Sequence, residues 1–201
     1  MSEFEIFFKL GIEHILDLNG YDHLLFIVAL CTVYALKDWK KMFALATAFT
    51  LGHSITLALA TFELVSFPSD IIEFLIPVTI IITAVVNLFR KESSPGPYPY
   101  SRANNGIGVS YFFATFFGLV HGLGFSNYLR SMLGKSSSIT SELIAFNLGI
   151  EVAQLVIVLV FLLVSYILVS LGGIKRREWN VGVSSGVIAL AVSLAVAAKF
   201  W

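Results

Sequence analysis

Long apolar segments, separated by short polar ones, recur along the whole chain. Those that reach or approach membrane-spanning length are 22–36, 41–61, 70–89, 107–128, 141–171 and 180–200. A helix needs roughly 20 apolar residues to cross the hydrocarbon layer of a bilayer. The pattern therefore predicts an all-α integral membrane protein, a bundle of about six transmembrane helices forming one domain over residues 1–201.

The N-terminal stretch has a different pattern from the spans. Residues 4–16 are apolar and aromatic but carry Glu5, Lys9 and Glu13. Such a stretch is typical of a helix lying at the membrane surface. The Asn19-Gly20 pair breaks this interfacial helix from the first span.

The composition supports the membrane assignment. Of the 201 residues, 57% are hydrophobic and only 13% are charged, and the mean hydropathy of +0.86 is far from that of a soluble domain. The formal net charge of zero gives no indication of nucleic-acid binding, and the expected partners are the lipid bilayer and a metal ion. The single cysteine, Cys31, cannot form an internal disulfide and is expected to pack in the apolar interior.

Basic residues predict the orientation of the chain. Cytoplasmic loops of membrane proteins are enriched in lysine and arginine. One set of loops contains Lys37, Lys40, Lys41, Arg90, Lys91, Arg102, Lys175, Arg176 and Arg177, whereas the other side has Lys9, Arg130, Lys135 and Lys199. Both termini are therefore predicted to be extracytoplasmic, and residues 91–106 to form a flexible cytoplasmic loop.

All four histidines fall at a similar predicted depth, in the outer half of the membrane. His53 lies eight residues from the outer end of its span, which corresponds to about 12 Å at the helical rise of 1.5 Å per residue. His121 lies at a comparable depth, and His23 begins the first span. The break at Asn19-Gly20 lets the chain turn back, so His14 can fold over the mouth of the bundle.

This shared depth predicts a metal site. Ionisable groups within spans are costly and usually mark a functional site, although a hydrogen bond between helices would also explain His53 or His121. Asp22, at a helix start, could equally serve the helix dipole. The candidate metal ligands are His14, Asp22, His23, His53 and His121.

A polar stripe marks the fifth span. Asn147, Glu151 and Gln154 recur at helical spacing on an otherwise apolar helix, so they face protein or a water-filled cavity. Together with Ser54, they are expected to contact the metal ligands from outside rather than to bind the ion themselves.

Two short sequences suggest an internal repeat. The second span contains F-T-L-G-H-S (49–54), and the fifth contains F-N-L-G-I-E (146–151). Each span is the middle helix of a three-helix half, and the two halves would be inverted relative to each other, as in many transporters.

Four motifs resemble those of the HupE/UreJ family of bacterial membrane proteins, and most closely its second, less characterised branch. They are G-I-E-H-I-L-D-L-N-G-Y-D-H-L-L-F (11–26), F-T-L-G-H-S-I-T-L (49–57), F-G-L-V-H-G-L-G-F (117–125) and F-N-L-G-I-E-V-A-Q (146–154). The resemblance implies a multi-pass protein of the bacterial cytoplasmic membrane. It also implies a nickel or cobalt permease, or a metal-handling accessory protein.

The first of these motifs departs from the better-known branch. The resemblance matches His14, Asp22 and His23 to the first-helix metal motif of the family. Here, however, the segment between His14 and Asp22 is longer, and Ile15 stands where that branch has proline.

Two functions follow from these residues. Imidazole and carboxylate ligands suit a divalent Ni, Co or Zn ion, which a permease would transport. The alternative is an intramembrane zinc-dependent hydrolase acting on a lipid or lipid-linked substrate. In that enzyme Asp22 or Glu151 would be the general base, and Ser54 or Asn147 would stabilise an oxyanion.

Overall fold

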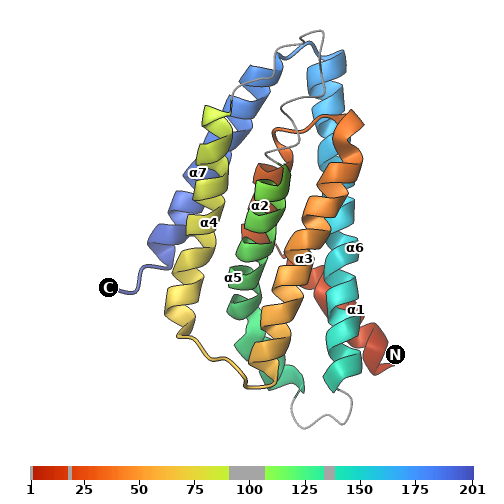
Figure 1. The fold of residues 1–201 in the computed structure, drawn as a ribbon, viewed down its shortest axis with the longest axis vertical. Helices are drawn as coiled ribbons and strands as arrows, with labels where there is room; N and C mark the ends of the chain where they lie inside the picture. Colours follow the sequence, from red (N-terminus) through yellow and green to blue (C-terminus); the bar gives the residue numbers. More distant parts are fainter. Residues whose placement is uncertain (1, 18–19, 91–106, 134–138) are drawn as a thin grey trace.

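The computed structural model describes residues 2–17, 20–90, 107–133 and 139–201, and it confirms the predicted all-α fold (Figure 1). No strand occurs in these described ranges. The helices are α1 (Glu3–Leu16), α2 (Asp22–Cys31), the 3-10 helix η1 (Leu36–Asp38), α3 (Trp39–Thr61), α4 (Ser69–Phe89), α5 (Ile107–Leu133), α6 (Ile139–Ser165), the π-helix η2 (Tyr166–Leu171) and α7 (Arg176–Ala197).

Five of the helical segments in the described ranges are long and apolar enough to cross a membrane: Leu36–Thr61, Ser69–Phe89, Gly108–Met132, Ile139–Leu171 and Arg176–Ala197. The remaining predicted span, 22–36, is shorter than expected. It forms the ten-residue helix α2, whose length of about 15 Å is half the apolar layer. The predicted loop at 91–106 lies outside the described residues.

Helix α2 lies within the bundle rather than beside it. It contacts α4, α6 and α7, and Phe26, Ala29 and Cys31 are fully buried. The free thiol of Cys31 packs in this apolar interior, as its sequence context indicates. The start of α2 thus presents Asp22 and His23 to the centre of the molecule.

Helix α1 forms where the sequence predicted an interfacial helix, and it packs along α6. Gly11 makes this contact possible, because a Cβ there would overlap with the carbonyl oxygen of Phe146. Gly149 of α6 is placed in the same way against the carbonyl oxygen of Phe8. Paired glycines let two helix backbones approach closely, so this crossing brings His14 inward, one turn after Gly11.

Helices α3 and α5 cross by the same device. A Cβ at Gly52 would overlap with the carbonyl oxygen of Thr115, and one at Gly118 would overlap with that of Phe49. His121 follows Gly118 by three residues, as His14 follows Gly11. The two crossings are therefore equivalent, with α1 matching α5 and α6 matching α3.

This equivalence supports the internal repeat suggested by the sequence. Gly52 and Gly149 are the glycines of the two similar segments, and their helices α3 and α6 run in opposite directions (Figure 1). The helices that follow them, α4 and α7, pack against each other. The halves of the chain are thus related by an inverted arrangement, and the histidines lie between the two glycine crossings.

Candidate metal centre

Four imidazole rings, each from a different helix, gather in the interior. His23 of α2 is central: its ring centre lies 4.6 Å from that of His14 in α1, 5.5 Å from His53 in α3 and 5.2 Å from His121 in α5. The rings of His14 and His53 are 5.9 Å apart. The structure therefore brings together all the histidines that the sequence indicated as ligands.

Most of the ring nitrogens in this cluster lack a hydrogen-bond partner. The buried, unpartnered atoms are His14 Nε2, His23 Nε2, His121 Nδ1 and both ring nitrogens of His53. His53 and His121 are fully buried, and His23 is 3% exposed. Buried polar atoms normally have a partner, because leaving one unpaired costs about 1–3 kcal/mol. Five such atoms in one place indicate a site for a ligand that accepts nitrogen lone pairs.

The possible ligand atoms form two groups that share His23. One group is His14, His23 and His53, and the other is Asp22, His23 and His121; within each group, the ligand atoms lie within 4.8 Å of one another. Metal bonds to nitrogen and oxygen are about 2.0–2.2 Å long, so small side-chain movements suffice for either group to surround one ion. The cluster thus offers two neighbouring positions for a cation.

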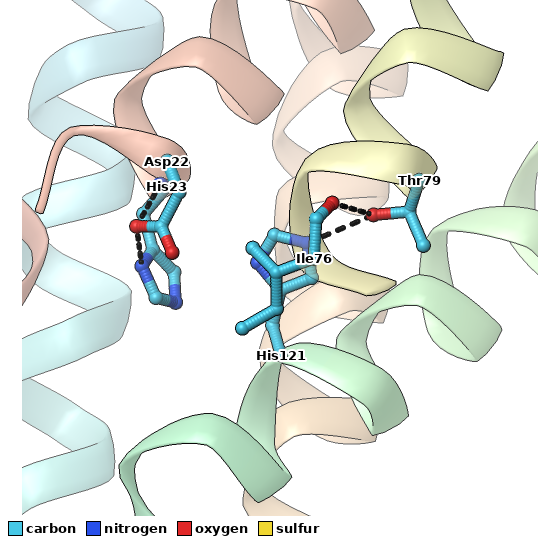
Figure 2. Close-up of polar contacts among 5 residues, drawn as sticks. All are labelled: Asp22, His23, Ile76, Thr79 and His121. Carbon is cyan, nitrogen blue, oxygen red and sulfur yellow. Dashed lines mark hydrogen bonds and ion pairs between the residues drawn. The ribbon is translucent and has the colours of Figure 1, made fainter. Parts of the chain in front are cut away.

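Asp22 orients the shared histidine. Its Oδ1 lies 2.9 Å from Nδ1 of His23 and accepts a second hydrogen bond, of 2.7 Å, from the His23 backbone N–H (Figure 2). A proton on Nδ1 leaves Nε2 with its lone pair available. Burial alone raises the pKa of Asp22, but its electrostatic and hydrogen-bonding interactions with His23 outweigh burial and hold this pKa well below its usual range.

Thr79 of α4 orients His121 in a similar way. Its hydroxyl donates to the backbone oxygen of Ile76 at 2.7 Å and lies 3.0 Å from Nε2 of His121 (Figure 2). Because the single hydroxyl proton goes to Ile76, the Thr79 oxygen accepts from Nε2–H. The lone pair of His121 is then on Nδ1, the atom without a partner. Sequence reasoning missed Thr79, because one threonine in an apolar helix carries no periodic signal.

Aromatic rings enclose the cluster. The ring centre of Phe125 lies 4.0 Å from that of His14. The ring centres of Phe49 and Phe26 lie 5.1 Å and 5.3 Å from that of His121. These rings exclude water and lower the local dielectric constant, which strengthens electrostatic interactions. Burial, with the neighbouring His23 acting in the same direction, lowers the pKa of His14 well below its ordinary value and keeps its ring neutral. A neutral imidazole is the form that binds metals.

The polar stripe of α6 lies apart from the two ligand groups. Glu151 accepts a hydrogen bond from Thr47, and Asn147 from Ser54. Gln154 accepts from Thr50. Within the described part of the chain, neither candidate ligand group contains Glu151. Of the two general bases named for the hydrolase alternative, Asp22 has its Oδ1 engaged by His23, and Glu151 has its Oε1 engaged by Thr47.

Fold and site together define a multi-pass membrane protein with a buried histidine and carboxylate cluster. Its whole chain, residues 1–201, matches the family model described as HupE / UreJ protein, and the chain therefore belongs to the HupE/UreJ family. Neither the curated proteins nor the solved structures contain a match.

Proposed function

We propose that this protein binds Ni²⁺ or Co²⁺ in the histidine cluster and transports the ion across the bacterial cytoplasmic membrane. The observation that carries the proposal is the set of five unpartnered ring nitrogens, which converge from four helices. Imidazole nitrogen with one carboxylate suits borderline divalent ions. The HupE/UreJ family is related to nickel and cobalt transport, which favours these two ions over zinc.

The basic loops predict which end of the bundle faces the cytoplasm. The positive-inside bias puts the ends of α3 and α4 near Lys41 and Arg90 on the cytoplasmic side. His53 is then in the outer half of α3, and the short helices α1 and α2 contribute the two histidines nearest the outside. In this orientation His14, Asp22 and His23 would capture an ion that enters from outside, and His53 and His121 would hold it at depth, with His23 common to both ligand groups.

The test is cobalt uptake by vesicles containing the purified protein. Wild-type vesicles should accumulate cobalt, and the His53→Ala and His121→Ala variants should lose most of that uptake and bind cobalt more weakly. Asn127→Ala, a change of an exposed residue on α5, is the control and should transport normally. Binding without uptake in wild-type vesicles would contradict transport while leaving the metal centre intact.

A further inference from the structure

A cavity lies beside the metal centre, toward the end of the bundle where α4 ends. Its volume is about 160 Å³, and residues of α2, of the turn after α2, of α4 and of α5 line it. None of the candidate metal ligands is part of this lining. Phe26 lines the cavity and also contacts His121, with the two ring centres 5.3 Å apart. The cavity is therefore a separate site that adjoins the histidine cluster at Phe26.

The cavity reaches from the apolar surface of the bundle into its interior. Val86 of α4 is 59% exposed and Val109 of α5 is 54% exposed, so these two residues form the rim. Phe26, Ala114 and Phe117 are buried and form the inner wall. Exposed apolar side chains on membrane-spanning helices lie against the acyl chains of the lipid. The opening of the cavity therefore faces lipid rather than water.

Two polar side chains of α4 in the lining are hydrogen-bonded within the protein. Thr83 donates to the backbone oxygen of Thr79 at 2.9 Å, and Asn87 donates to that of Ala29 at 2.7 Å. Most of the remaining lining is aliphatic or aromatic, so the interior of the cavity suits an apolar ligand. An apolar cavity of about 150 Å³ holds a ligand of benzene size, so this one has room for roughly six carbon atoms of an acyl chain.

Arg90 alone is charged among the described residues that line the cavity. It directly follows the last residue of α4, and its guanidinium group lies 5.5 Å from the ring centre of Tyr34, another lining residue. This cation–π contact holds the guanidinium group in place without neutralising it. In the part of the chain that the structure describes, no carboxylate forms an ion pair with Arg90. Such a guanidinium group is suited to bind a phosphate through two hydrogen bonds.

The ligand must match both an apolar wall and a positive charge. An acyl chain gains little by leaving the bilayer for the cavity, because lipid tails are as apolar as the wall. Selectivity must then come from the headgroup. An anionic headgroup places a phosphate on Arg90 and brings no cation of its own, whereas a zwitterionic headgroup adds a positive charge close to the guanidinium group. The positive-inside bias predicts Arg90 on the cytoplasmic side, where basic pockets between membrane helices bind anionic headgroups.

We propose that this cavity binds an anionic phospholipid, with part of one acyl chain between α2, α4 and α5 and the phosphate group on Arg90. The inference is independent of the proposed function, because no metal ligand takes part in it. A protein that transports no metal could still bind the lipid, and the converse also holds.

The test is native mass spectrometry of the full-length, delipidated protein in detergent, titrated with phosphatidylglycerol or with phosphatidylcholine. The wild type should bind its first phosphatidylglycerol about ten-fold more tightly than phosphatidylcholine, the factor that a hydrogen bond to a charged group commonly contributes. Arg90→Gln should lose this preference, and Arg90→Lys should keep part of it. Lys40→Gln is the control, because Lys40 is an exposed basic residue at the predicted cytoplasmic end of α3 that does not line the cavity.

A second pair of variants tests the position of the acyl chain. Val86→Trp places a large ring at the rim of the cavity and should weaken the binding of both lipids. Val85→Trp changes the neighbouring exposed valine, which does not line the cavity, and should bind both lipids like the wild type. Both variants keep an apolar side chain against lipid, so both should fold.

Three results would overturn the proposal. The first is equal affinity of the wild type for the two lipids. The second is a preference lost equally in Arg90→Gln and Lys40→Gln, which would assign it to the general charge of the surface. The third is unchanged binding in Val86→Trp, which would show that the acyl chain does not enter the cavity.

Discussion

The hydroxyl oxygen of Thr79 lies 3.0 Å from Nε2 of His121, and this contact determines which nitrogen of the imidazole can bind a metal. Since the Thr79 proton is donated to the backbone of Ile76, Nε2 carries the proton of His121 and Nδ1 carries the lone pair. Thr79 is outside both ligand groups, yet it fixes the tautomer of His121. Residues that contact metal ligands from outside commonly have this effect.

Replacing Thr79 with valine should weaken cobalt binding by about 10- to 100-fold, because the shape is kept but the oxygen that fixes the tautomer is lost. Thr79→Ser should restore most of the affinity. Thr83→Val, one turn further along α4, is the matched control and should bind cobalt like the wild type. Calorimetric titration measures the affinity, and ¹⁵N NMR of His121 reports its tautomer. Equal affinities and tautomers in wild type and Thr79→Val would refute this role.

Asp22→Asn should reduce cobalt affinity by a similar factor of about 10–100 while leaving the fold intact. Asparagine keeps the size of aspartate but removes the one negative charge of the ligand groups and weakens the hold on His23. Glu13→Gln, at an exposed carboxylate of α1 paired with Lys9, is the control. Undiminished affinity in Asp22→Asn would show that this carboxylate is only a helix-start residue.

His23 belongs to both candidate ligand groups, whereas His14 and His121 each belong to one. His23→Ala should therefore abolish cobalt binding, and His14→Ala and His121→Ala should each leave weakened binding through the other group. Equilibrium dialysis with purified variants distinguishes these results. If His14→Ala removes all binding and His121→Ala none, the second position does not exist.

The glycine crossings predict a steric effect. Gly52→Ala should destabilise the protein by about 1–3 kcal/mol, the usual cost of overpacking, because the new methyl group would overlap with the backbone of α5. Gly186→Ala on α7 is the matched control, since its Cβ would meet no atom within 4 Å. Thermal unfolding in detergent compares the two. A Gly52→Ala variant as stable as Gly186→Ala would contradict the close crossing.

Much of the fold could be predicted from sequence, because bilayer thickness imposes a minimum length on apolar helices. That rule located α3, α4, α5, α6 and α7. It failed for α2, because a helix surrounded by protein need not reach across the bilayer, and hydropathy does not reveal what surrounds a helix. The inward packing of α1 was also missed, because it depends on Gly11 lying against the backbone of α6 and Gly149 lying against that of α1, which are contacts between distant segments.

The candidate ligands were predictable for a related reason: a histidine within an apolar span is conspicuous. His14 lies outside any span, and its place near the other histidines was predicted from a chain break expected before the first span. The place of Glu151 was predicted less well. Its spacing with Asn147 indicated a polar face on α6, but only the helix packing shows that this face meets Thr47 and Ser54 of α3.

The central claim is that the histidine cluster is a metal site, and the most direct test is the metal content and ligation of the purified protein. The full chain is prepared without a histidine tag or chelator, loaded with cobalt, dialysed, and analysed by elemental analysis and X-ray absorption. We predict one tightly held ion per chain, with imidazole nitrogens among ligands at about 2.0–2.2 Å, and none in His23→Ala. Cobalt retained equally by wild type and His23→Ala, or by neither, would contradict the claim.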